Sequence, residues 1–141
     1  MNDALQIGRI GEYLAAAVLE QMGFDVNIIA GKKYDLLVTA NEKMYRVQVK
    51  STSRDNSTNR ARKPSYEFRT SHGSSGKKLY AKGEMDIFAL VAIDIRKVLF
   101  VAADSITAVT KRVPPADFVG IDSESKSWDQ SVAALQAVQV P

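Results

Sequence analysis

Any chemistry performed by this chain must come from carboxylates, amides, amines or hydroxyls. It has no cysteine, which excludes disulfides, thiolate zinc sites and cysteine nucleophiles, and its single histidine, His72, argues against a serine–histidine triad or a multi-histidine metal site. Three suitable groups fall on two segments with the pattern of strands: Asp35 in residues 34–39, and Gln48 and Lys50 in residues 44–50. The available chemistry is therefore acid–base and electrostatic.

The spacing of these residues predicts that they meet. Side chains alternate between the faces of a strand, so Gln48 and Lys50 share one face. Asn41 and Glu42 suit a hairpin turn, and a hairpin centred there pairs residues whose numbers sum to 83. Asp35 then lies opposite Gln48, with Cβ atoms roughly 5 Å apart, and Lys50 lies diagonally at about 7–8 Å. A slip of one residue would send the pair to opposite faces.

Glu12 is a second carboxylate with an unusual setting. It lies on a predicted helix, residues 4–22, beside small residues that allow close approach of a backbone or a ligand: Gly8, Gly11, Ala15 and Ala16. Alone, Glu12 is equally well explained as a solvated helix carboxylate with small neighbours that serve tight packing. Asp35 and Lys50 alone are ordinary charges at strand ends. The combination is what indicates a site.

The elements that must position these residues follow the order helix, three strands, basic loop, two strands and helix. Apolar periodicity and turn residues predict a helix at 4–22, strands at 24–30, 34–39, 44–50, 86–94 and 98–102, and a last helix that ends near residue 138. Ser127 and Gln130 resemble a capping box for that helix. This order predicts an α/β (α+β) fold with a mixed central β-sheet flanked by helices. The apolar stripe of the last helix either covers the sheet or forms a dimer interface.

The net charge of +3 is unevenly distributed. Residues 51–83 contain eight basic residues and only two acidic ones, so the rest of the chain is net negative. The segment is also rich in Ser, Thr, Asn and Gly, which predicts mostly loop, with a short strand near residues 66–70. A cationic loop on a slightly acidic domain indicates a polyanionic partner. The alternative is a solvated linker.

Length and composition limit the remaining classes. A chain of 141 residues with 45% apolar and 25% charged residues suits one folded domain, here predicted to span residues 1–141 with a flexible basic loop at about 51–83. Its apolar runs are too short for a bilayer-spanning helix, so no membrane partner is expected. The first residues lack the basic-then-apolar order of a secretory signal.

The set Glu12, Asp35 and Gln48-Val49-Lys50 resembles the PD-(D/E)XK nuclease superfamily. Gln48 stands where that superfamily usually has its second acid. Tyr34 stands where the superfamily motif has a proline before its first acid. The QVK strand, with the later segments 80–88 and 98–101, is most similar to a small branch that includes intron homing endonucleases. The spacing from Gly8 to Glu12 also resembles archaeal-type Holliday junction resolvases. The resemblance covers roughly residues 5–104.

The resemblance implies a restriction-endonuclease-like core and a site that hydrolyses phosphodiester bonds with Mg²⁺, for which Mn²⁺ would substitute. Hard oxygen ligands suit that ion. Glu12, Asp35, Gln48 and the carbonyl of Val49 would hold the metal, and Lys50 would orient or help deprotonate the attacking water. Because glutamine removes one negative charge, we expect weaker metal affinity than in an all-acid site.

The implied partner is DNA, in branched or duplex form. The cations expected to contact it lie in and before the basic segment: Lys32, Lys33, Arg54, Arg60, Arg62, Lys63, Arg69, Lys77, Lys78 and Lys82. A homodimer is expected, with a tetramer as the alternative, in the cytoplasm of a prokaryotic cell or a phage-infected host. Asp86 resembles an acidic position of the homing branch, although a strand-start carboxylate without function is the favoured explanation.

Three classes of function remain open at this point. The first is a metal-dependent endonuclease, either structure-selective on branched DNA, as a Holliday junction resolvase is, or sequence-specific, as a homing enzyme is. The second is a non-catalytic nucleic-acid-binding module, which would bind no divalent metal near Asp35. The third is a protein-interaction domain, for which the basic segment would be incidental. The small surface available for base readout favours branched DNA, whereas the QVK resemblance favours the homing type.

Overall fold

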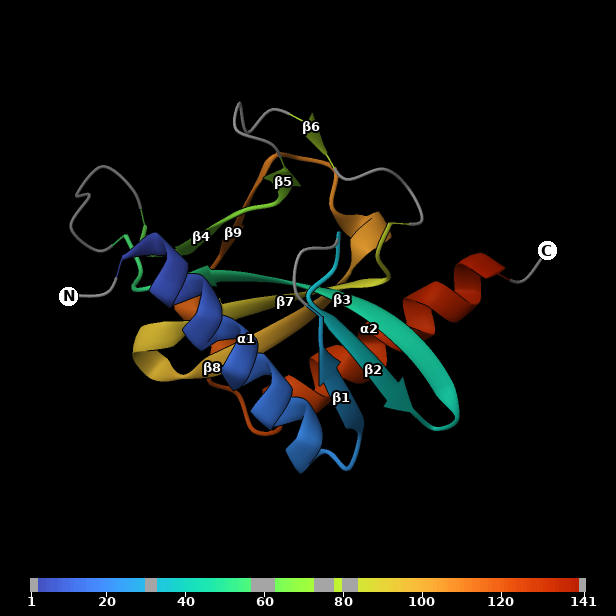
Figure 1. The fold of residues 1–141 in the computed structure, drawn as a ribbon. Helices are drawn as coiled ribbons and strands as arrows, with labels where there is room; N and C mark the ends of the chain where they lie inside the picture. The colour runs from blue at the N-terminus through green and yellow to red at the C-terminus, as the bar shows by residue number, and fades with distance from the viewer. Residues whose placement is uncertain (1–2, 30–32, 57–62, 73–77, 80–83, 140–141) are drawn as a thin grey trace.

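The computed structural model describes residues 3–29, 33–56, 63–72, 78–79 and 84–139, and its elements follow the predicted order (Figure 1). The two helices are α1 (Ala4–Gln21) and α2 (Ser123–Gln139). The strands are β1 (Asp25–Ile28), β2 (Leu36–Ala40), β3 (Lys43–Thr52), β4 (Tyr66–Arg69), β5 (Ser71–His72), β6 (Lys78–Leu79), β7 (Ile87–Ala92), β8 (Lys97–Ala102) and β9 (Thr110–Val113). Short 3-10 turns occupy Ile93–Ile95, Ala103–Ser105 and Pro115–Phe118.

Helix α1 begins and ends where local sequence signals place its ends. The Asp3 carboxylate accepts a hydrogen bond from the Gln6 N–H at 2.9 Å, and the Gln6 side chain accepts one from the Asp3 N–H at 3.3 Å. This reciprocal capping box satisfies two N–H groups that a helix start leaves unpaired. Gly23, with φ of 90°, follows the last turn and takes a backbone conformation that other residues avoid.

The β2–β3 hairpin has the predicted register. Asn41 and Glu42 have φ values of 52° and 68°, as a two-residue type I′ turn requires. The paired residues run from Ala40–Lys43 to Leu36–Val47. Each pair therefore sums to 83, which confirms the predicted alignment.

Five strands form one mixed sheet in the order β1-β2-β3-β7-β8. β3 and β7 are parallel, and the other neighbours are antiparallel. All six residues of β7 are buried, as expected for an apolar strand inside a sheet that is covered on both faces. The predicted mixed sheet flanked by helices is confirmed.

Each face of the sheet has its own apolar core. Helices α1 and α2 cover one face, and the β4–β9 pair with the turn at Pro115–Phe118 covers the other (Figure 1). Trp128 of α2 lies at the centre of the first core, with ring-centroid distances of 5.4 Å to Phe24, 5.4 Å to Tyr45 and 5.3 Å to Phe100. The apolar stripe of α2 therefore covers the sheet. No helix in the described ranges is both long and apolar enough to span a membrane.

The start of α2 differs from the prediction. The helix begins at Ser123, so Ser127 lies inside it and the predicted capping box is wrong. The Ser127 hydroxyl accepts a hydrogen bond from the Phe100 N–H at 3.0 Å, and the Glu124 carboxylate accepts one from the Val98 N–H at 2.9 Å. These bonds satisfy N–H groups on the outer edge of β8, which would otherwise be open to pairing with another strand. A short sequence pattern cannot distinguish such a tertiary bond from a local cap.

The segment 51–83 contains more strand than predicted. Its first two residues still belong to β3, and it includes β4, β5 and β6 rather than one short strand. Tyr66 and Phe68 are buried against the sheet, while Glu67 and Arg69 between and after them are not, which is the alternation of a half-buried strand. Residues 57–62, 73–77 and 80–83 lie outside the described part of the chain.

Candidate active site

Asp35 is fixed by hydrogen bonds from three sides. Its N–H donates to the Val47 carbonyl at 2.8 Å, and its carbonyl accepts from the Ile29 N–H at 2.7 Å. Its carboxylate Oδ2 accepts from the Val49 N–H at 2.8 Å. Within the described ranges, Oδ1 has no hydrogen-bond partner. The carboxylate is therefore held in one orientation with one oxygen available to a ligand.

The contact between Asp35 and β3 differs in detail from the predicted pair. The regular ladder ends at Leu36–Val47, and Asp35 lies one residue beyond it. Its carboxylate reaches the backbone of Val49 instead of standing directly across from Gln48 in the ladder. The hairpin register was thus predictable, but the way the strand ends was not.

The end of β2 leaves backbone groups of β3 directed at the site. The Val49 N–H points toward Asp35, and the N–H and carbonyl of one strand residue point to the same edge. The Val49 carbonyl is therefore directed to the side where β2 no longer pairs with β3. This orientation fits the metal-ligand role expected for that carbonyl.

Gln48 presents an oxygen that lacks a partner. The residue is only 8% exposed, and its Oε1 atom is buried with no hydrogen bond to any described group. A buried polar atom without a partner costs free energy, and such atoms are rare in native structures. A cation held beside Asp35 would satisfy this oxygen.

Gly11 explains how Glu12 comes to the same place. A Cβ atom on Gly11 would overlap the Ser51 hydroxyl and lie 2.9 Å from the Ser51 Cβ, so only glycine allows α1 to approach β3 this closely. The next residue, Glu12, then lies near enough to Asp35 for the two charges to interact. Gly8, in contrast, has nothing within 4 Å of its added Cβ. Tight packing therefore accounts for Gly11 but not for Gly8.

Burial disfavours the charged forms of Asp35, Glu12 and Lys50. Burial raises the pKa of Asp35, although its bond from Val49 and the charge of Lys50 oppose this. Burial, followed by the negative charge of Asp35, raises the pKa of Glu12. Burial lowers the pKa of Lys50, and the positive charge of Arg69 adds to that effect. A divalent cation between the two carboxylates would favour their ionised forms.

The residues present fit a hard divalent cation. Glu12 and Asp35 supply carboxylates, Gln48 supplies an amide oxygen and Val49 supplies a carbonyl oxygen, which are the oxygen types that Mg²⁺ and Ca²⁺ prefer. No three residues of the types His, Cys, Asp and Glu gather in the described ranges. The candidate centre has only two carboxylates, so its charge is low for a divalent ion.

Replacing Gln48 with glutamate is expected to strengthen metal binding by about tenfold, because ligand charge tunes the affinity of such sites. Calorimetric titration of Mn²⁺ into the free protein measures this without any cleavage assay. Gln48→Ala, which removes the oxygen, should bind the ion more weakly than wild type. Equal Mn²⁺ affinity in all three proteins would show that Gln48 is not a ligand.

The cations expected to contact DNA are distributed as follows. Arg54, Lys63 and Arg69 are exposed. Lys33 pairs with Glu84, with Nζ and Oε1 3.1 Å apart, and no local sequence pattern predicts this ion pair. Lys78 lies in β6. The other five predicted cations lie outside the described residues: Lys32, Arg60, Arg62, Lys77 and Lys82.

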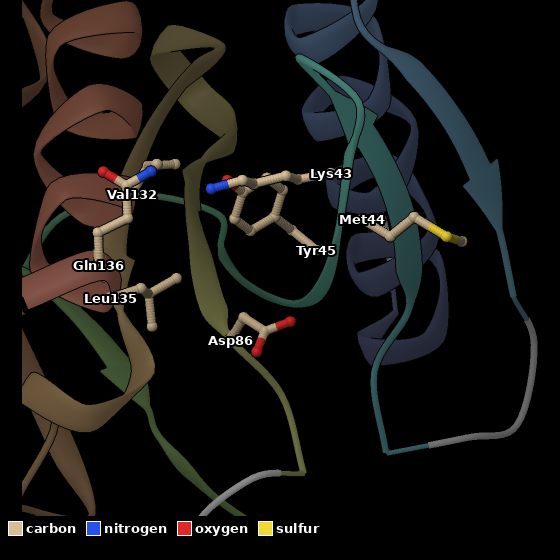
Figure 2. A pocket seen from close by; sticks show the side chains of 7 residues that line it. All are labelled: Lys43, Met44, Tyr45, Asp86, Val132, Leu135 and Gln136. Atoms are coloured by element: carbon tan, nitrogen blue, oxygen red, sulfur yellow. The ribbon is translucent and has the colours of Figure 1, made fainter. Parts of the chain in front are cut away.

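Asp86 has a structural contact away from this site. Its carboxylate accepts from the Arg46 N–H at 2.7 Å and from the Arg46 guanidinium at 3.1 Å, which joins the start of β7 to β3. It lies at a pocket of about 300 Å³, with Tyr45 on the strand side and side chains of α2 opposite (Figure 2). The structure thus gives Asp86 a role at the strand start, in agreement with the simpler of the two sequence interpretations.

The five-stranded mixed sheet flanked by helices is that of a restriction-endonuclease-like fold. The chain belongs to the PD-(D/E)XK endonuclease family, whose pattern matches residues 2–116. The structure of a bacterial homing endonuclease, I-Ssp6803I, is similar, with a TM-score of 0.63 and 15% identity over 94% of this chain and 99% of the other. No curated protein matches the sequence significantly. The predicted family and fold are confirmed.

Proposed function

We propose that this chain is a Mg²⁺-dependent DNA endonuclease whose active site consists of Glu12, Asp35, Gln48 and Lys50, with the Val49 carbonyl as a further metal ligand. One observation carries the proposal. The Asp35 carboxylate, fixed by the Val49 N–H, interacts with the charges of both Glu12 and Lys50 beside the strand that holds the unpartnered Gln48 oxygen.

Hydrolysis of a phosphodiester forms a bond from a water oxygen to phosphorus and breaks one ester P–O bond. Bound Mg²⁺, or Mn²⁺ in its place, would acidify that water and offset negative charge on the phosphate. Lys50 can donate a hydrogen bond to the water, and because its pKa is lowered it gives up a proton more readily than an ordinary lysine does. Asp35 is held rigidly by its backbone bonds, so it needs no reorganisation during the reaction.

Two forms of DNA compete as substrate. The basic segment is rich in residues that contact phosphates rather than bases, which favours structure-selective cutting of branched DNA, as in a Holliday junction resolvase. The similarity to a homing endonuclease over nearly the full length of both chains favours site-specific cutting of duplex DNA. Either reaction on two strands calls for more than one active site, and we propose a homodimer, with a tetramer as the alternative.

The deciding experiment incubates the protein and Mg²⁺ with matched linear, nicked, flap and four-way-junction DNAs. Symmetric nicks near the branch point would identify a resolvase, and cutting of one long duplex site would identify a homing-type enzyme. DNA binding without cleavage, and without metal binding in calorimetry, would identify a non-catalytic module. Sedimentation of the protein with and without DNA measures the number of subunits. The cytoplasm of a prokaryotic cell or a phage-infected host is the proposed location.

Neutralising Arg60, Arg62 and Lys63 together is expected to weaken DNA binding and flatten its salt dependence. Each lost phosphate contact removes about 0.9 from the slope of log K against log salt concentration. Fluorescence anisotropy across a salt series measures the slope. The control neutralises three exposed cations elsewhere, namely Lys43, Lys97 and Lys126. If both triple variants keep the wild-type slope, the basic segment is a solvated linker.

A further inference from the structure

Arg69, the last residue of β4, has a rigidly anchored backbone. The residues on either side, Phe68 and Thr70, are each only 1% exposed. The Thr70 N–H donates to the Val109 carbonyl at 2.8 Å, and the Thr70 hydroxyl donates to the Ala108 carbonyl at 2.7 Å. The Arg69 side chain itself is exposed, so a fixed backbone directs this guanidinium outward.

Arg69 lies on the strand that covers the sheet face of Lys50. Its neighbour Phe68 packs in one apolar core with Leu90 of β7, and Leu90 pairs directly with Lys50, so the two side chains share a face. β4 packs against β3, the strand that carries Lys50 (Figure 1). Burial is the main cause of the lowered pKa of Lys50, the charge of Asp35 opposes it, and the positive charge of Arg69 is near enough to add to it. Two cations held close together repel each other, and this repulsion is relieved when an anion binds between them.

Arg69 also differs from Arg46 and Arg112, the arginines of β3 and β9. Arg46 pairs with Asp86 at 3.1 Å, and Arg112 pairs with Glu67 at 3.1 Å. Over the described part of the chain, Arg69 has neither a hydrogen bond nor an ion pair. Its planar donor fork matches two oxygens of a phosphate group.

We propose that Arg69 binds the non-bridging oxygens of the phosphate that is cut, next to Lys50, and is therefore a catalytic residue. The proposal rests on the endonuclease function proposed above and adds a residue from outside the acid–amide–lysine set. It separates Arg69 from Arg54, an exposed cation that follows the end of β3 and does not belong to the strand packed on it. Arg54 would contact the DNA backbone elsewhere.

The experiment tests whether the effect of the Arg69 side chain depends on the negative charge of the phosphate at the cut position. Wild type, Arg69→Ala, Arg69→Lys and Arg54→Ala are compared on the DNA that wild type cuts and on the same DNA with a neutral methylphosphonate at the cut position. Affinity is measured with Ca²⁺, and single-turnover cleavage is measured with Mg²⁺. Melting temperatures show that each variant is folded.

Arg69→Ala should lower the saturated cleavage rate by about 10²-fold, as loss of one donor to a developing charge does. It should weaken binding of the normal DNA by about tenfold, the usual effect of losing one charged hydrogen bond. Arg69→Lys should fall between wild type and Arg69→Ala. On methylphosphonate DNA, Arg69→Ala should bind as tightly as wild type. Arg54→Ala, in contrast, should weaken the binding of both DNAs equally.

The assignment would be overturned if Arg69→Ala weakened the binding of both DNAs equally, or if it left the saturated cleavage rate unchanged. Arg69 would then be a general contact to the DNA backbone. That result differs from failure of the proposed function, in which wild type itself cuts none of the DNAs with Mg²⁺ or Mn²⁺. In that case the assignment of Arg69 is overturned together with the function.

Discussion

Replacing Asp35 with asparagine is expected to lower the rate of metal-dependent DNA cleavage by about 10³-fold or more. The variant loses the negative charge that would hold the proposed cation, and metal assistance contributes several kcal/mol to such reactions. The asparagine side-chain oxygen can still accept the hydrogen bond from Val49, so the shape of the site is kept. Single-turnover cleavage with Mg²⁺, at saturating protein, measures the effect.

Asp35→Asn should leave the metal-free protein as stable as wild type, or more stable. Burial raises the pKa of Asp35 in the folded protein, so its favourable contribution belongs to the protonated form. That contribution is complete below the ordinary pKa of an aspartate and is lost as the pH rises through the raised value. The metal-free wild type should therefore lose melting temperature over this pH range, and Asp35→Asn should lose less.

Lys50→Ala provides a second test of the same site. Loss of a group that orients water or exchanges its proton typically costs about 10² to 10⁴ in rate. DNA affinity measured with Ca²⁺ should change little in either variant, because most of the binding comes from cations elsewhere. Cleavage at the wild-type rate by Asp35→Ala or Lys50→Ala would show that the site is wrongly assigned.

Gly11→Ala is expected to destabilise the protein by about 2 kcal/mol and to reduce cleavage. The added methyl group would overlap the Ser51 side chain, and overpacking of this kind costs about 1–3 kcal/mol. Relief of the overlap must move α1 away from β3, which carries Glu12 away from Asp35. Urea unfolding and single-turnover cleavage measure the two effects.

Gly8→Ala is the matched control on the same helix. Its added methyl group meets nothing within 4 Å, so it should stabilise the helix by about 0.5–1 kcal/mol and leave cleavage unchanged. Combining Gly11→Ala with Ser51→Gly removes the atoms that the methyl group meets and should recover much of the loss. Equal effects of Gly8→Ala and Gly11→Ala would exclude the close contact of α1 with β3 as the element that positions Glu12.

Local rules made the elements of this fold predictable. The Asp3–Gln6 capping box marks the start of α1 and Gly23 marks its end. The Asn41-Glu42 turn fixes a register in which the numbers of paired residues sum to 83. Each of these signals acts between residues that are near neighbours along the chain. The residues of the proposed site were also chosen from the sequence, because a carboxylate, an amide and a lysine interrupt strands that are rich in apolar residues.

Long-range contacts decided the geometry of the site. The sequence did not show that Asp35 would bond to the Val49 N–H, that Gly11 would pack on Ser51, or that Lys33 would pair with Glu84. Ser127 shows the limit clearly, because its pattern predicted a local cap and its hydroxyl instead bonds to β8. Periodicity and turn residues specify which face a side chain occupies within its own element. Which atoms meet across elements depends on how helices and sheet pack, and this is set by the shapes of many side chains acting together.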